Sequence, residues 1–190
     1  DWEALENVIE LMQNIMQDLR FAPFPVVAAP FGLVLGGGYE TIGACDRIVA
    51  AAESYIGLVE VGVGLIPGAG GNLRIISRLT KKINTIVPGA FPIVQKAFEI
   101  IGYAKVSFSA KQAQAYGYLS KDDLIVINRE HLLSAAKQSV IDLSDGYKAP
   151  EVETFKLPGS AGRLAIEMVA KGMVKSGKIS EHDALIGKKL

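Results

Sequence analysis

The chain has 190 residues, of which 49% are apolar and 21% are charged, and its 20 basic residues balance its 20 acidic ones. This length and apolar content are typical of one domain, or most of one, with a sizeable buried core. The zero net charge excludes the bulk basic character of proteins that bind nucleic acid or an acidic membrane surface. The single cysteine, Cys45, excludes an internal disulfide and favours a reducing, cytoplasmic location. Without a run of about 18 uncharged apolar residues, the sequence predicts no membrane span.

The first half of the chain predicts short strands that alternate with helices. Apolar residues recur at helical spacing over 2–20, and Pro23 and Pro25 end that helix. Further strands are expected at 26–29, 33–35, 47–51 and 55–58, and further helices at 39–45 and from 67–71 to about 79. Strands that alternate with glycines and helices favour an α/β layer fold with crossover connections.

The second half is predicted to be mainly helical. Ser109 and Gln112 form a capping box that starts a helix, and Gly117 ends it. Ser180 caps the last helix. The remaining expectations are two short helices within 80–100, a strand at 124–127, a helix at 129–143, a linker at 144–159 and helices at 161–175 and 181–189.

Two glutamates beside glycine-rich segments carry the chemical information. Glu40 closes the sequence LGGGYE (35–40), and Glu60 closes IGLVE (56–60), which the sequence GLIPGAGG (64–71) follows. Both carboxylates interrupt apolar stretches, where burial raises a carboxyl pKa and prepares it for proton transfer. Glycine lets backbone amides approach a ligand and point at a developing anion. The pattern therefore indicates acid–base chemistry beside a carbonyl group.

The same segments allow other interpretations. Each glutamate could instead be a surface charge or a partner of an arginine, namely Arg47, Arg74 or Arg78. No Lys-Ser or Lys-Thr pair follows the glycines, which excludes the phosphate loop of nucleoside triphosphatases, and the segment 62–64 lacks the spacing of a dinucleotide fingerprint.

The histidines and the cysteine favour structural roles. His131 and His182 lie far apart among charged neighbours, so solvated side chains are expected and a metal site is not. Cys45 is interpreted as a small buried residue and not as a nucleophile.

Together these motifs resemble the crotonase superfamily, the enoyl-CoA hydratases and isomerases. The resemblance is densest over 25–80, and its segments are PVVAA (25–29) with Gly32, LGGGYE (35–40), Cys45-Asp46, EVGVGLIPGAGG (60–71) and SAKQA (109–113). It implies a crotonase-like α/β core of repeated βα turns with additional C-terminal helices. By the same comparison, 1–143 is a partial crotonase core that lacks the family's first half, and 144–190 holds a linker and the C-terminal helices.

The resemblance also implies roles for four residues. Glu40 and Glu60 match the two catalytic glutamates of the family, Gly37 matches a backbone donor of the oxyanion hole, and Gly68 matches the amide that helps to hold the reacting water. The implied activity is that of an enoyl-CoA hydratase that adds water to a trans-2-enoyl-CoA in fatty-acid degradation. Glu40 would mainly activate water, and Glu60 would exchange a proton at the α-carbon. The alternatives are an enoyl-CoA isomerase or related acyl-CoA lyase, and a non-catalytic oligomerisation or acyl-CoA-binding module.

The departures from the family shape further expectations. Phe31 stands where the family usually has Asn, and Val59 stands where it usually has Pro. The family's first half carries the other oxyanion-hole amide and much of the coenzyme A cradle, so the 190-residue piece alone is expected to have little activity. The segment KLPG (156–159) and the terminal helices resemble the carboxyl end of proteins in which a 3-hydroxyacyl-CoA dehydrogenase domain comes first. NAD would bind in that upstream domain, whereas this portion implies no cofactor or metal. A trimer-based homo-oligomer is expected.

Overall fold

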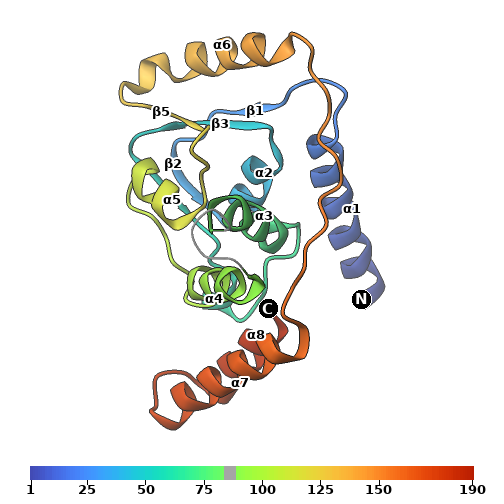
Figure 1. Cartoon of the computed structure of the whole chain (residues 1–190), viewed down its shortest axis with the longest axis vertical. Coiled ribbons are helices and arrows are strands. Elements are labelled where there is room, and N and C mark those ends of the chain that lie inside the picture. The colour runs from blue at the N-terminus through green and yellow to red at the C-terminus, as the bar shows by residue number, and fades with distance from the viewer. Residues whose placement is uncertain (84–88) are drawn as a thin grey trace.

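The computed structural model describes residues 1–83 and 89–190, and the following account is confined to them. The first helix, α1 (Trp2–Arg20), starts at the N-cap Asp1 and ends where predicted, ahead of Pro23. Five short strands and further helices follow it (Figure 1). No described helix is both long and apolar enough to cross a membrane.

All five strands lie in parallel sheets. Strands β1 (Val27–Ala28), β3 (Arg47–Ala51) and β5 (Leu124–Val126) form one sheet in the order β1-β3-β5. Strands β2 (Gly32–Leu35) and β4 (Ser54–Gly57) form the second sheet. Parallel neighbours require crossover connections, so this topology confirms the predicted α/β class.

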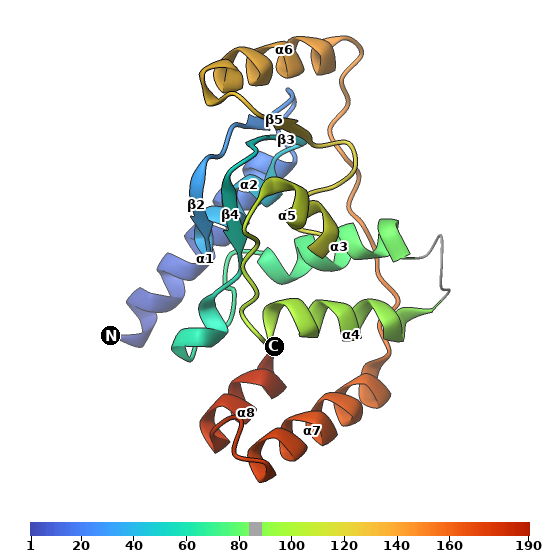
Figure 2. The ribbon, with the colours of Figure 1, turned by 90° about the vertical axis from the view of Figure 1, so that its left-hand side faces the viewer.

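Helices cover the sheets and complete the core. Helix α6 (Leu132–Ser144) lies along the outer side of the three-stranded sheet, and the remaining core helices lie on its other side (Figure 2). These helices are α2 (Gly37–Ala44), α3 (Gly71–Ile83), α4 (Ala90–Ile101) and α5 (Ala110–Tyr116). The buried rings of Tyr39 and Tyr118 meet edge to face with their centroids 4.8 Å apart. The Tyr118 hydroxyl accepts a hydrogen bond from the Leu58 amide (3.1 Å) and donates one to the Lys105 carbonyl (2.7 Å), which fixes the chain just after β4.

After α6 the chain runs without regular structure past α1 and α3 to the terminal helices α7 (Gly159–Lys175) and α8 (Glu181–Lys189) (Figure 1). The Tyr147 hydroxyl donates a hydrogen bond to Asp46 (2.9 Å), and Glu153 forms a 2.5 Å ion pair with Lys81. The predicted irregular segment and both terminal helices are thus present, and the segment is attached to the core at two points.

The structure corrects several local predictions. A single helix, α4, stands where two short ones were expected, and part of that prediction falls on 84–88, outside the described residues. Helix α3 continues to Ile83 because its apolar face remains periodic beyond Leu79. The Gln112 side chain accepts from the amide of Phe108 and not from that of Ser109, so the capping box is not closed. Short 3₁₀ helices at Glu60–Val63 (η1) and Arg129–His131 (η2) were not predicted.

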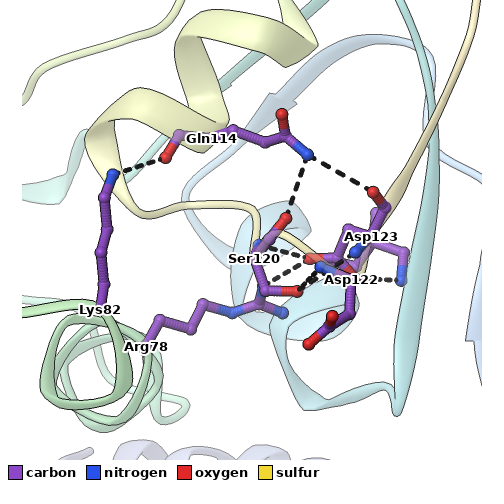
Figure 3. Close-up of polar contacts among 7 residues, drawn as sticks. Arg78, Lys82, Gln114, Ser120, Asp122 and Asp123 are labelled. Atoms are coloured by element: carbon purple, nitrogen blue, oxygen red, sulfur yellow. Dashed lines mark hydrogen bonds and ion pairs between the residues drawn. The ribbon is translucent and has the colours of Figure 1, made fainter. Parts of the chain in front are cut away.

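A buried aspartate connects three elements of the core. The Oδ1 atom of Asp123 accepts a hydrogen bond from the Ile48 amide of β3 (2.7 Å). Its Oδ2 atom accepts from Arg78 of α3 and from the Ser120 amide, at 2.6 Å each (Figure 3). A charge that is shared in this way ties the sheet, α3 and the turn after α5 together.

We predict that Asp123→Ala lowers the free energy of unfolding by about 3–5 kcal/mol, because the buried Arg78 guanidinium and two amides lose their acceptor. The neighbouring Asp122 is exposed, so Asp122→Ala should change this free energy by no more than about 0.5 kcal/mol. Chemical denaturation of both variants measures the difference. Equal effects of the two substitutions would contradict the role given to Asp123.

Candidate functional site

The two-stranded sheet brings both predicted glutamates to one edge. In the parallel register Leu35 pairs with Gly57, and the Gly36 amide donates to the Gly57 carbonyl at 2.8 Å. Glu40 follows β2 in the first turns of α2, and Glu60 follows β4 as the first residue of η1. Since parallel strands end at the same edge of a sheet, their following residues meet there.

Glu40 is buried and fixed by the backbone. Its side chain is 3% exposed, and its Oε1 atom accepts hydrogen bonds from the amides of Ala69 and Gly71, at 2.8 Å each. These charge-assisted bonds attach the glycine turn before α3 to α2. A Cβ atom on Gly71 would lie 2.7 Å from Cδ2 of Leu58 and 3.1 Å from Oε1 of Glu40, so this close approach requires glycine. The carboxylate is therefore held in one orientation, while neither amide bonds its Oε2 atom.

Glu60 is half-buried and less well satisfied. Its Oε2 atom is buried and has no hydrogen-bond partner among the described residues. Burial raises the pKa of Glu60 above its ordinary value, and the negative charge of Glu40 raises it further, while the amides of Glu60 and Val59 oppose the rise. A carboxyl group with a raised pKa can hold a proton and donate it.

Each carboxylate packs against a glycine that belongs to the glycine-rich segment beside the other glutamate. The position of a Cβ on Gly36, four residues before Glu40, lies only 3.3 Å from Oε1 of Glu60, and Gly36 has a left-handed φ of 55°. Gly71, which contacts Glu40, follows the segment that begins at Glu60. A glycine of each segment therefore lies in close contact with one of the two carboxylates.

The N-terminus of α2 lies in the same place. Gly37 is its first residue and is exposed, and a Cβ there would meet nothing within 4 Å. The first amides of an α-helix have no partner four residues earlier and carry positive potential. The residue with left-handed backbone is Gly36 and not Gly37, so Gly37 combines an ordinary backbone conformation with open space.

Gly68 is also exposed, but residues that follow it, and not Gly68 itself, donate hydrogen bonds to Glu40. The amides that bind Glu40 belong to Ala69 and Gly71, whereas the Gly68 carbonyl accepts a hydrogen bond from Gln13 Nε2 (2.8 Å). The water-holding role of the Gly68 amide stays a prediction. The contact from Gln13 was missed because a single glutamine on an amphipathic helix gives no sequence signal.

The alternative interpretation of the glutamates as ion-pair partners is wrong. Within the described part of the chain neither Glu40 nor Glu60 forms an ion pair, and Arg78 is bound to Asp123 instead. Both histidines are exposed, as expected. Cys45 is buried, and burial together with Asp46 raises the pKa of its thiol to about 11, so its thiolate is disfavoured.

Comparison with known proteins gives matches whose names refer to enzymes of acyl-CoA substrates. The family described as enoyl-CoA hydratase/isomerase matches residues 5–88. A probable 3-hydroxyacyl-CoA dehydrogenase of Bacillus subtilis is 46% identical over 98% of this chain and 23% of its own length. A human mitochondrial methylglutaconyl-CoA hydratase is 32% identical over 72% of this chain and 35% of its own. The chain thus spans about a third or less of these relatives.

Solved structures show the same fold. An enoyl-CoA hydratase from Bacillus anthracis superposes with a TM-score of 0.62 and 24% identity, covering 100% of this chain and 60% of that one. The family match includes both glutamates and the glycines that pack against them. Residues 5–88 are thus similar to the enoyl-CoA hydratase/isomerase family, and the chain shares its fold with a solved enoyl-CoA hydratase.

Proposed function

We propose that this chain supplies the two catalytic carboxyl groups of an enoyl-CoA hydratase that acts in fatty-acid degradation. The observation that carries the proposal is the meeting of Glu40 and Glu60 at one sheet edge, beside the open N-terminus of α2. A hydratase needs two proton-transfer groups on one side of its substrate and a donor for the thioester oxygen. The position of Glu40, Glu60 and the Gly37 amide at this edge supports the proposal.

The different environments of the two carboxyl groups suit different roles. Glu40, held by two amides, accepts a proton from water as the water oxygen bonds to the β-carbon. Glu60, whose pKa is raised by burial, donates a proton to the α-carbon. The enolate that forms between these events is stabilised by the Gly37 amide and the positive end of α2. Transfer of the proton that Glu40 gained to Glu60 then restores the starting protonation of both groups.

The longer polypeptide would couple this step to oxidation. The similarity to the Bacillus subtilis protein over nearly the whole chain supports a partner domain with 3-hydroxyacyl-CoA dehydrogenase activity and NAD as its cofactor. Hydration of a 2-enoyl-CoA yields a 3-hydroxyacyl-CoA, which is the substrate of such a dehydrogenase. We place the protein in the cytoplasm and expect it to form trimers.

Glu60→Gln in the intact protein should reduce hydration of a 2-enoyl-CoA by at least about 10²-fold, because a positioned proton donor contributes about 10²–10⁴-fold. Glu40→Gln should have a similar effect. The decrease in enoyl absorbance measures hydration, and NADH formation in the same sample tests the coupled dehydrogenase. If Glu40→Gln is mild and a 3-enoyl-CoA is isomerised instead, the protein is an isomerase. If both variants keep normal turnover, the proposed roles are wrong.

The raised pKa of Glu60 predicts that Glu60→Gln, which should lower activity, increases the stability of the folded protein. Below its ordinary value of 4.5 the group is protonated in both folded and unfolded chains, so it has no effect. As the pH rises through the higher folded pKa, the buried carboxylate increasingly destabilises the folded state. Glu60→Gln should therefore raise the melting temperature near pH 7 but not near pH 4.

The exposed Glu53 provides the control for this experiment, because Glu53→Gln should leave both melting temperatures unchanged. Loss of activity together with a gain of stability is typical of a residue placed for function. A variant that is destabilised near pH 7 would show that Glu60 has a structural role.

Gly37→Val should reduce turnover by about 10²–10³-fold without lowering the melting temperature, because the side chain enters open space in front of the amide. Gly172 of α7 also has open space around its Cβ position and is not one of the proposed donors, so Gly172→Val controls for the general effect of placing valine at a helical glycine. Initial rates and thermal melts of both purified variants give the comparison. A fall in turnover that follows the fraction of unfolded protein would exclude Gly37 as a donor.

A further inference from the structure

A second concave region lies at the opposite end of α2 from Gly37. It is a cavity of about 730 Å³ between the ends of α1 and α2, helix α3 and the chain from Lys111 to Asp123. Cys45, which caps the C-terminus of α2, lines it. Since α2 has eight residues and rises about 1.5 Å per residue, this end lies about 12 Å from Gly37. The cavity is therefore separate from the carboxylate site.

The lining of this cavity is strongly basic. Of its 19 lining residues, three are acidic and eight are basic, the latter being Arg20, Arg47, Arg74, Arg78, Lys81, Lys82, Lys111 and Lys121. Such an excess of positive charge within one concave surface creates a potential that attracts anions. The two ends of α2 thus differ in the chemistry of the groups around them.

Some of these charges are already matched. Arg78 is neutralised by Asp123, and Lys81 by Glu153. The Lys82 ammonium donates to the carbonyl of Gln114 (Figure 3) and to that of Ala115. These contacts form part of the wall of the cavity.

Two of the three acidic groups of the lining are occupied by hydrogen bonds as well. Asp46 accepts hydrogen bonds from the Val26 amide (2.8 Å) and from Tyr147 (2.9 Å). Both oxygens of Asp123 accept hydrogen bonds from the core. The exposed Asp122 is the third acid.

Arg74 is the exception among the buried cations. Arg74 is only 9% exposed, yet its side chain forms no hydrogen bond and no ion pair with the described residues. Its stem packs against Gly43, where a Cβ would lie 3.4 Å from Arg74 Cγ. Burial and the positive charge of Arg20 lower the pKa of Arg74, while Glu153 and Tyr39 oppose this. None of the Arg74 nitrogens is among the fully buried polar atoms without a partner, and the residue lines the cavity, so an anion bound there can reach the guanidinium.

We propose that this cavity binds a phosphorylated small molecule with at least two negative charges, and that the Arg74 guanidinium is its central contact. The planar fork of arginine matches two phosphate oxygens at once, and Arg20 and Arg47 add further guanidinium groups to the lining. A cavity of about 730 Å³ is in the range of small-molecule sites. The phosphates could belong to a free nucleotide or to coenzyme A, and binding measurements can separate these sources.

Calorimetric titration of the intact protein with pyrophosphate tests the proposal. Pyrophosphate should bind the wild-type protein, less tightly at high salt, and Arg74→Gln should weaken binding by at least about tenfold, because hydrogen bonds to charged groups contribute most to such contacts. Arg163→Gln removes the same charge from the exposed face of α7 and should leave binding unchanged. Absence of pyrophosphate binding at millimolar concentration, or equal binding to the wild type and Arg74→Gln, would overturn the proposal.

Two further measurements complete the test. Competition by ADP but not by coenzyme A assigns the site to a free nucleotide, and competition by coenzyme A assigns it to the coenzyme. If Arg74→Gln does not fold, Arg74→Lys keeps the charge but loses the fork, and the double variant Arg47→Gln/Lys111→Gln reduces the charge of the lining without touching Arg74. Either should weaken pyrophosphate binding several-fold, and unchanged binding in both would refute the site.

Discussion

The close packing of two carboxylates against two glycines is the constraint on which the rest of the site depends. Glu60 lies against Gly36, and Glu40 lies against Gly71, so each glutamate occupies space that a side chain would otherwise fill. The amides that hold Glu40 come from the turn that Gly71 ends. As a result, neither glycine-rich segment can move without moving a carboxyl group. The parallel pairing of β2 and β4 fixes the starting points of both segments.

This arrangement leaves the two carboxyl groups in unequal environments. Glu40 has two amide donors, whereas one oxygen of Glu60 is buried without a partner. Burial raises the pKa of Glu60, and this is the basis on which the proposed mechanism gives Glu60 the role of proton donor. A fold selected for stability alone would pair Glu60 with a donor or replace it with an apolar residue. The unsatisfied oxygen is consistent with the proposed role of Glu60, although three other buried polar atoms among the described residues also have no partner.

Sequence reasoning found the elements but not their closest contacts. Helical periodicity located α1 with its observed ends, and the content of isoleucine and valine located β3, because both signals depend on local geometry. The glutamates stood out because a charge within an apolar run is unusual. The contacts of Gln13 and Arg74 depend on which surfaces meet in three dimensions, and no local pattern encodes that. The turn η1 was missed because four residues that contain glycine carry too little periodicity to identify.

Helix α2 connects the carboxylate site with the basic cavity, and its polarity is suited to both ends. At its N-terminus the free amides near Gly37 offer positive potential, which in the proposed mechanism acts on the negative charge of the enolate. At its C-terminus the helix dipole is negative, which favours the guanidinium groups that gather beyond Cys45. The dipole thus stabilises the unpaired Arg74 in the absence of an anion, and it does so through the helix that carries Glu40. An anion bound in the cavity would offset part of this interaction, so charge at one end of α2 is physically linked to the electrostatics of the other.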